Sequence, residues 1–397
     1  MEIKKRALLT RAVLRSVAWP AYWKKRLTGG SRNGADRPKP SRIALFVSME
    51  LLGGGIIISS MVKAIRQLYP EATVYIVGEH HRSGKLEGFF KKHSWVDELI
   101  ICPPRDNSTI RDWIKFYRKL RSYKLDMAVL SPNHSCSDSV WLHLCGIPEI
   151  VGCYLPKTWD KLGLIENLFL TGRLTERQIG DGPYRLLNFP EAYARTITGR
   201  DDLKIEELVP YIRYEDTVEL PREGAKVTLH PGGPSIKRWP VEKFIELGKR
   251  LAQVHDAALY IIGGKPEAHL AKQITEGIIE DFPQAKVVNC CGCSLNDSMA
   301  YIAHSTIYVG NNTGPVQIAV ALGVPVVGVF REQDRWFSGP DAAGDRHYVV
   351  SRPDLNNLSV DEVWSVIERL WPESEQAHAR RFNLPLHDQP DLSVPAS

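Results

Sequence analysis

Two stretches of the sequence alternate short apolar segments with longer segments of helical periodicity, and this pattern constrains the fold most. The first stretch begins with the apolar segment 43–47, and the second begins with 226–230. Such alternation is typical of parallel sheets that are covered by helices. At 397 residues the chain is long enough to place the two sheets in separate domains. We therefore expect an α/β protein with two successive domains and a ligand-binding cleft between them.

Changes in composition indicate the limits of these domains. Residues 1–42 form a basic amphipathic arm that ends in a linker rich in Gly, Pro and Ser, and residues 43–205 form the first domain. The charged, turn-prone residues 206–224 indicate a hinge before the second domain, residues 225–372. Residues 373–397 combine prolines with polar side chains, so we expect them to form a flexible tail.

The overall composition is that of an ordinary soluble globular protein, with 43% hydrophobic and 24% charged residues. No apolar run approaches the length of a membrane span, and no secretory signal is recognisable. The seven cysteines are scattered, which favours reduced thiols in the cytoplasm. Cys290, Cys291 and Cys293 cluster, but they lack a fourth ligand at metal-binding spacing, so we expect a buried turn with inert thiols.

Positive charge is concentrated in the arm. Residues 1–42 contain twelve Lys or Arg side chains against Glu2 and Asp36, so the arm carries +10 and the remaining chain −5. Basic residues and interfacial aromatics follow one another here, which suits the surface of an anionic membrane. We therefore expect residues 1–28 to contact anionic lipid. A solvated extension is the main alternative interpretation, and a nucleic-acid-binding tail is less favoured.

Two segments that follow predicted strands of the second domain suit a nucleoside diphosphate. Before a predicted helix, Ser235 supplies a hydroxyl, and Lys237 and Arg238 supply two cations that suit a diphosphate. After the next strand, Gly263 and Gly264 precede Glu267, whose carboxylate would accept hydrogen bonds from ribose hydroxyls. A glutamate in the first turn of a helix is also a routine partner of the helix dipole, which is the structural alternative.

A third segment places Asn312, Thr313 and Gly314 at the start of another predicted helix. The N-terminus of a helix offers unpaired backbone N–H groups and a partial positive charge, so it can hold a phosphate. By itself, the segment fits an ordinary capped connection between a strand and a helix equally well. The agreement with the other two segments favours a phosphate site.

Together these segments resemble glycosyltransferase family 9, the heptosyltransferases that build the inner core of lipopolysaccharide. Residues 231–240 match the family's Pro-Gly-Ala-Ser…Lys-x-Trp-Pro segment, and 263–267 match its Gly-Gly…Glu turn. Residues 312–325 match its Asp-Thr/Ser-Gly-Pro-x-His-x-x-x-Ala-x-Gly-x-Pro signature with two substitutions. The resemblance covers residues 41–372 and is most specific in the C-terminal half.

The resemblance implies a GT-B fold, with two Rossmann-like domains facing each other across a cleft, and an inverting mechanism. No Asp-x-Asp pair follows a predicted strand, so we expect the reaction to need no metal ion or other cofactor. The donor would be ADP-heptose and the acceptor a lipopolysaccharide core or another lipid-linked or saccharide group. The enzyme would be cytoplasmic and peripheral to the inner face of the inner membrane. Lys237 would neutralise the leaving diphosphate and so act in catalysis. The implied donor-binding residues are Ser235, Lys237, Arg238, Glu267, Asn312, Thr313, Gly314 and Gln317.

The sequence departs from the family where the family has its catalytic base. Aligning the first strand and the following helix places Gly54 at the position of the family's N-terminal aspartate, and glycine cannot accept a proton. Glu50, four residues earlier in the predicted glycine turn, is the nearest carboxylate and our candidate for a substitute base. A solvated loop acid is the alternative interpretation. His134 and Asp138, in the loop after a later strand, are further candidates on the acceptor side.

Two more departures affect the third segment. Asn312 replaces the family's aspartate and Gln317 replaces its histidine, so hydrogen-bonding capacity is kept while a charge and a titrating group are lost. Asn312 and Gln317 leave open a transferase for a different donor sugar. Gly54 leaves open a second alternative, a non-catalytic relative that binds a nucleotide sugar or a glycan.

Overall fold

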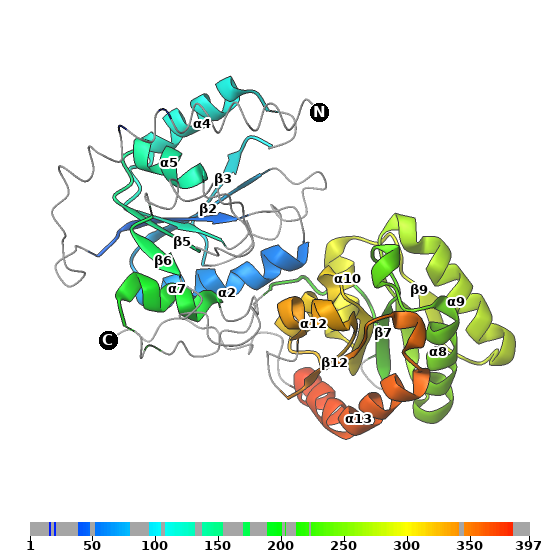
Figure 1. Ribbon diagram of the computed structural model, residues 1–397. Helices are drawn as coiled ribbons and strands as arrows, with labels where there is room; N and C mark the ends of the chain where they lie inside the picture. Colours follow the sequence, from blue (N-terminus) through cyan, green and yellow to red (C-terminus); the bar gives the residue numbers. More distant parts are fainter. Residues whose placement is uncertain are drawn as a thin grey trace. The chain divides into compact units, whose positions relative to one another are not determined.

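The computed structural model describes residues 16, 20, 39–47, 52–79, 95–104, 108–131, 137–153, 170–174, 189–200, 203, 212–221, 224–340 and 345–383. Contacts within the chain divide it into two compact units. The first comprises residues 1–182 and 188–208, and the second comprises 183–187 and 209–397. Each unit holds one six-stranded sheet in its described part (Figure 1).

The first unit alternates strands and helices along the chain. Its elements are β1 (Arg42–Val47), α2 (Leu52–Leu68), β2 (Thr73–Glu79), β3 (Glu98–Cys102), α4 (Ile110–Ser122), β4 (Met127–Leu130), α5 (Ser137–Leu144), β5 (Glu149–Cys153), β6 (Gly172–Leu174) and α7 (Phe189–Thr198).

The second unit repeats this alternation. Its elements are β7 (Lys226–His230), η4 (Ser235–Lys237), α8 (Val241–His255), β8 (Ala258–Ile261), η5 (Lys265–Glu267), α9 (Ala268–Asp281), β9 (Val287–Asn289), α10 (Leu295–Ala303), β10 (Ile307–Asn311), α11 (Gly314–Ala321), β11 (Val326–Arg331), α12 (Glu332–Ser338), β12 (His347–Arg352), η7 (Leu355–Asn357) and α13 (Val360–Asn383).

Both sheets have the strand order of a Rossmann fold. The first is ordered β3-β2-β1-β4-β5-β6 and the second β12-β11-β10-β7-β8-β9, and the strand pairs are parallel. In each sheet the order reverses between the first and fourth strands, where ligands bind in folds of this type. The prediction of two Rossmann-like α/β domains is thus confirmed.

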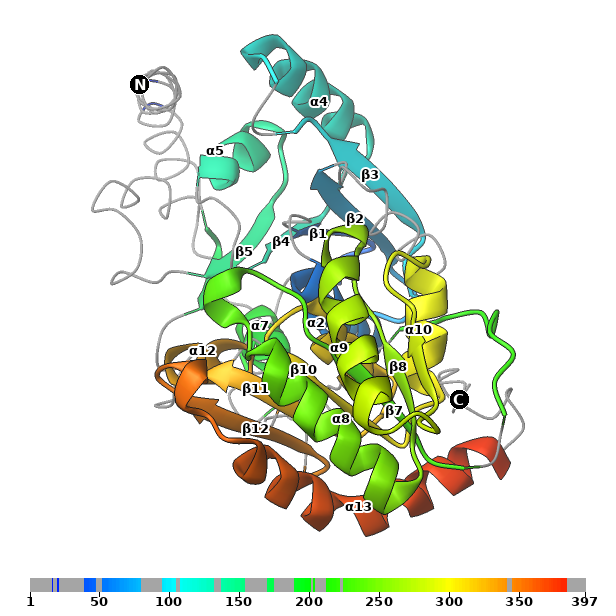
Figure 2. The same cartoon turned by 90° about the vertical axis from the view of Figure 1, so that its right-hand side faces the viewer.

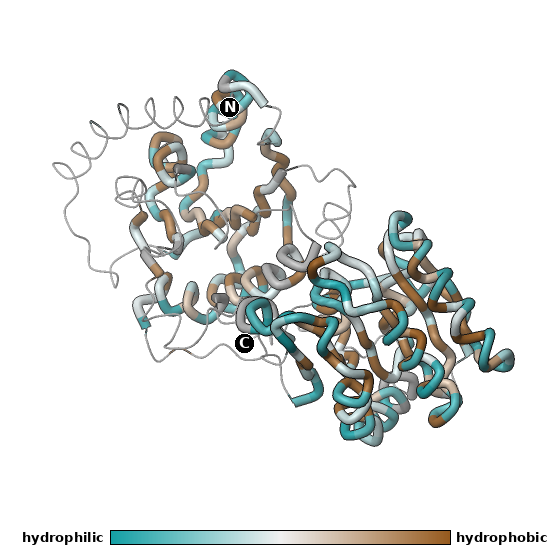
Figure 3. Tube along the Cα trace, turned by 45° about the vertical axis from the view of Figure 1, so that its right-hand side comes forward, coloured by the Kyte–Doolittle hydropathy of each residue, from teal (hydrophilic) through white to brown (hydrophobic). Residues whose placement is uncertain are grey.

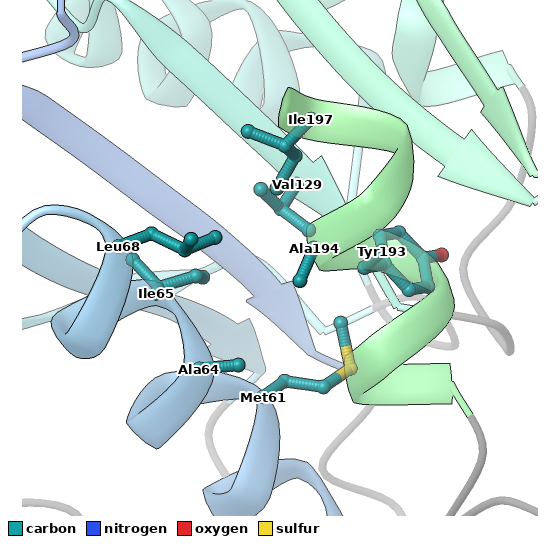
Figure 4. Close-up of a pocket in the computed structure, with 8 residues that line it drawn as sticks. All are labelled: Met61, Ala64, Ile65, Leu68, Val129, Tyr193, Ala194 and Ile197. Atoms are coloured by element: carbon teal, nitrogen blue, oxygen red, sulfur yellow. The ribbon is translucent and has the colours of Figure 1, made fainter. Parts of the chain in front are cut away.

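In the first unit, α4 and α5 cover one face of the sheet, and α2 and α7 cover the other (Figure 1). A small apolar hollow lies between α2, α7 and β4, where Met61 and Ile65 approach Ala194 (Figure 4). The Tyr193 hydroxyl beside it donates a hydrogen bond to the carbonyl of Leu130, the last residue of β4. These contacts fix α7 and α2 against the carboxyl end of β4.

The three glycines 53–55, which the sequence predicts as a turn, lie instead in the first turn of α2. Glycine costs about 1 kcal/mol per residue in a helix interior relative to alanine. Burial of the helix offsets this cost, because Ile56, Val62 and Ile65 are at most 3% exposed. Gly54 is therefore a helical residue, and the predicted glycine turn was wrong.

In the second unit, α8, α9 and α13 cover one face of the sheet (Figure 2). Alternate strand residues, such as Val227 with Leu229 and Ile307 with Val309, enter the core beneath these helices. The intervening residues, including His230, point to the opposite face, where the Thr228 hydroxyl donates to the carbonyl of Tyr301 in α10. Figure 3 shows the apolar strand interiors and the polar outer faces of the helices.

The predicted flexible tail begins with an ordered helix. Residues 373–383 continue α13 beyond Pro372, and within them Ser374 and His378 are buried. His378 Nε2 hydrogen-bonds to the carbonyl of His304 at 2.9 Å. These buried contacts explain why the helix continues although its sequence is polar, and the tail prediction was wrong for this segment.

Part of the predicted hinge is attached to the second unit. The described residues 212–221 form neither helix nor strand. The backbone N–H of Glu215 donates to the side chain of Asn296, and Asp216 pairs with His304 at 2.9 Å. Residues 212–221 are therefore bound to both ends of α10, to Asn296 in its first turn and to His304 directly after its last residue.

Candidate functional site

The three loops that the sequence singles out converge at the carboxyl ends of β7, β8 and β10. These strands are neighbours in the sheet, and β7 and β10 flank the point where the strand order reverses. A Cβ added to Gly233 would lie 2.7 Å from Cγ2 of Thr313, and one added to Gly232 would lie 2.9 Å from Oε1 of Glu267. The loop after β7 therefore packs closely against both other loops, and glycine suits these contacts because it has no Cβ.

Asn311, the last residue of β10, ties the loop after β7 to the sheet. Its fully buried side chain accepts a hydrogen bond from the backbone N–H of Trp239 at 3.1 Å. The amide nitrogen donates to the carbonyls of Pro231 at 2.9 Å and Gly232 at 3.2 Å. One amide thus fixes both ends of the loop that carries Ser235 and Lys237.

Trp239 anchors the same loop from its other end. Its side chain is 1% exposed, packs in the core against Phe244, and donates from Nε1 to the carbonyl of Leu358 at 2.9 Å. Between these anchors the loop is exposed at Ser235. The two ends of the loop are therefore fixed by hydrogen bonds, and the short helix η4 between them begins at an exposed residue.

The side chains of Thr313 and His230 are hydrogen-bonded to each other at the start of α11. The Thr313 hydroxyl hydrogen-bonds to His230 Nδ1 at 3.1 Å and donates to the carbonyl of Asn311 at 3.2 Å. Burial lowers the pKa of His230 to about 4, against the opposing effect of Glu267. The imidazole is consequently neutral at pH 7.

The Thr313 hydroxyl bonds to His230 and Asn311 and does not cap α11. Pro315 has no N–H group, so the first turn offers the N–H groups of Gly314 and Val316. These donors and the partial positive charge of the helix terminus suit an anion. Phosphate binding by Thr313 and Gly314 remains a prediction.

Glu267 bridges two of the loops. Its Oε2 accepts from the backbone N–H of Gly264 at 2.6 Å, and its Oε1 lies 3.4 Å from the N–H of Gly233. Each carboxylate oxygen can accept more than one hydrogen bond, so both oxygens can still accept from a ribose. Glu267 therefore braces the loops after β7 and β8 against each other.

The two predicted cations behave differently. Arg238 donates from Nε to the carbonyl of Gly233 and so supports the loop from within. The Lys237 ammonium lies 3.5 Å from the carboxylate of Asp334 in α12, and the side chain is 30% exposed. Lys237 thus reaches a side chain of α12, whereas Arg238 bonds within its own loop.

Asn312 and Gln317 occupy different environments. Asn312 is partly exposed next to Thr313, whereas Gln317 is 4% exposed within α11. Gln317 lies four residues after Thr313 and hence on the same face of the helix. A role in ligand binding remains a prediction for both residues.

On the first unit the structure describes only part of the predicted site. Glu50 and His134 lie outside the described residues. Asp138, in the first turn of α5, accepts a hydrogen bond from the Tyr117 hydroxyl at 3.1 Å. Gly54 lies in the first turn of α2, which contains no acidic residue.

The cysteine cluster lies next to Glu267. A Cβ on Gly263 would lie 2.9 Å from Sγ of Cys291. Burial raises the pKa of Cys290 to about 11 and that of Cys291 to about 12, so both thiols are protonated at neutral pH. In the part of the chain that the structure describes, no group of His, Cys, Asp or Glu side chains has metal-site geometry.

Sequence reasoning missed three residues of this site. Asn311 was not recognised because its partners lie 72 to 80 positions away in the sequence. Arg331 and Asp334 were also missed, although charged residues directly after the apolar strand 326–330 signal the carboxyl edge of the sheet.

Comparisons with known proteins agree with the family resemblance of the sequence. Residues 222–362 match the sequence model of glycosyltransferase family 9 (heptosyltransferase), which confirms the resemblance over that region. No curated protein sequence matches the chain significantly.

Solved structures share the fold at low sequence identity. An Escherichia coli ADP-heptose lipopolysaccharide heptosyltransferase II is 19% identical with a TM-score of 0.64, over 84% of this chain and 99% of that one. A family 9 glycosyltransferase from Veillonella parvula is 17% identical with a TM-score of 0.64, over 84% and 97%. The E. coli heptosyltransferase WaaC, solved with ADP, is 17% identical with a TM-score of 0.60, over 84% and 99%. These matches support the GT-B fold.

Asn311→Asp should destabilise the second unit. The substitution keeps the shape but replaces an N–H₂ donor with an acceptor that faces the carbonyls of Pro231 and Gly232. We expect a loss of about 3 kcal/mol in the free energy of unfolding, measured by chemical denaturation. The matched control Asn357→Asp, at an exposed position, should stay within about 0.5 kcal/mol of wild type. Equal stabilities of the two variants would contradict the bridging role of Asn311.

Proposed function

We propose that the chain is an inverting glycosyltransferase that moves a heptose or similar sugar from an ADP-sugar to a lipopolysaccharide core or related saccharide acceptor. The observation that carries this proposal is the convergence of three loops at the strand-order reversal of the second sheet. These loops lie within residues 222–362, which match the heptosyltransferase family. The solved neighbour WaaC holds ADP, which supports a nucleotide-sugar donor.

The second unit would bind the donor through its diphosphate and ribose. The N–H groups at the start of α11 and the Lys237 ammonium would contact the phosphates, and Glu267 would accept from ribose hydroxyls. As an acceptor hydroxyl attacks the anomeric carbon, the bond to the diphosphate breaks and negative charge grows on the leaving group. Fixed donors and cations at that position would stabilise the transition state without a metal ion.

Transfer from a panel of ADP-, UDP- and GDP-sugars, with ADP-heptose included, tests the proposal. We expect ADP-heptose to be used and Lys237→Ala to lower kcat/KM about a hundredfold, because the charge on the leaving diphosphate loses one partner. Lys249→Ala is the control, since Lys249 pairs with Asp281 on the outer helices. Equal kcat/KM values for Lys237→Ala and wild type would remove the assigned role of Lys237.

Gly54 motivates a second candidate, a relative that binds a nucleotide sugar without transferring it. A carboxylate at this position would lie in the first turn of α2, where the helix dipole favours a negative charge. If the missing base limits the reaction, Gly54→Asp should raise the transfer rate about a hundredfold or more, and Gly54→Asn should not. Donor binding by calorimetry with no transfer by wild type or Gly54→Asp would instead favour the binding module.

We also propose that residues 1–28 hold the protein at an anionic membrane surface on the cytoplasmic side. Their charge and aromatic residues support this, while the described helices include none that is long and apolar enough to cross a bilayer. The full chain should sediment with vesicles rich in phosphatidylglycerol, and deletion of residues 1–28 should leave it in the supernatant. Neutral phosphatidylcholine vesicles are the control. Sedimentation that does not change on deletion would contradict the role of the arm.

A further inference from the structure

Asp334 pairs with two cations that come from different elements of the second unit, β11 and η4. Its Oδ2 accepts a hydrogen bond from Nε of Arg331 at 2.9 Å and forms an ion pair with Nη2 of the same guanidinium at 2.8 Å. The Lys237 ammonium lies 3.5 Å from the same oxygen. The side chains are 14% exposed for Arg331, 19% for Asp334 and 30% for Lys237. These three residues form the Lys237–Asp334–Arg331 cluster.

The cluster lies at the edge of the sheet that carries the candidate donor site. Arg331 is the last residue of β11, and Lys237 lies in the loop after β7. β10, which leads into Thr313 and α11, is the strand between these two. The two cations therefore come from both sides of the strand that ends at the proposed phosphate site.

The charges of the cluster leave an excess of one positive charge, because one carboxylate faces two cations. Partial burial weakens solvent screening, so this excess acts more strongly on a nearby anion than it would on an open surface. Among the described residues, the hydrogen bonds and ion pairs of Arg331 involve Nε and Nη2 and not Nη1. Asp334 therefore binds the edge of the guanidinium formed by Nε and Nη2. The N–H donors on Nη1 can still bind a second anionic group.

We propose that Arg331 and Lys237 form a two-cation clamp for the donor diphosphate, and that Asp334 orients the Arg331 guanidinium. The identity of the ligand rests on the proposed function. Arginine suits this role because its planar fork can donate two parallel hydrogen bonds to phosphate oxygens. In the clamp, Arg331 is a donor-binding residue and Asp334 is a positioning residue that acts through it.

Calorimetric titration with ADP, inorganic pyrophosphate and adenosine tests the clamp directly. Arg331→Ala should weaken ADP and pyrophosphate binding about 10- to 100-fold and leave adenosine unchanged, because adenosine carries no phosphate. Arg331→Lys should recover only part of the loss. The matched control Arg250→Ala should bind like wild type, because Arg250 pairs with Asp361 and Glu246 on α8 and α13. Wild-type ADP affinity in Arg331→Ala would overturn the clamp.

Replacing Asp334 by asparagine, which removes the negative charge and keeps the shape of the side chain, tests its role. Asp334→Asn should weaken ADP binding severalfold while adenosine binding and the unfolding midpoint stay near wild type, and Asp334→Glu should restore part of the affinity. An equal loss for ADP and adenosine would indicate a merely structural role. Tighter ADP binding in Asp334→Asn would show that Asp334 competes with the ligand. Either result would overturn the positioning role.

The outcomes separate this inference from the proposed function. Pyrophosphate binding that depends on Arg331, without sugar transfer to any acceptor, would support the clamp and count against the transferase. Sugar transfer with unchanged kcat/KM in Arg331→Ala would support the transferase and overturn the clamp.

Discussion

The buried amide of Asn311 is the interaction on which the candidate site depends. It joins the end of β10 to both ends of the loop after β7, through Trp239 on one side and Pro231 and Gly232 on the other. The loop that carries Lys237 therefore takes its position from the strand that leads into α11. A hydrogen-bonded amide at zero exposure has no water to replace its partners, which makes the connection costly to break.

Several residues that the sequence assigns to ligand binding also hold the site together. Glu267 accepts a hydrogen bond from the backbone N–H of Gly264, and Arg238 donates one to the carbonyl of Gly233. A site whose donors are already in place loses little conformational entropy when a ligand binds. Preorganised dipoles are also the ones that stabilise charge most effectively in a transition state. The same contacts can therefore serve both stability and the proposed chemistry.

The sequence predicted the fold and the convergence of the three loops because both depend on local patterns. Apolar segments located β1 and β7, and glycines with polar residues located the strand ends. Residues whose role depends on distant partners could not be predicted. Asn311 acquires its function from Trp239 and Pro231, and Asp334 from Lys237. The helical glycines before Ile56 and the extension of α13 to Asn383 were missed because tertiary burial outweighs local propensity there.

A crystal structure of the chain with ADP would test the central claim most directly. We predict that the diphosphate contacts the backbone N–H of Gly314 and the side chains of Lys237 and Arg331, and that the ribose hydroxyls contact Glu267. The loop from Pro231 to Trp239 should keep its hydrogen bonds to Asn311. Nucleotide bound away from the start of α11, with these side chains unchanged, would contradict the account.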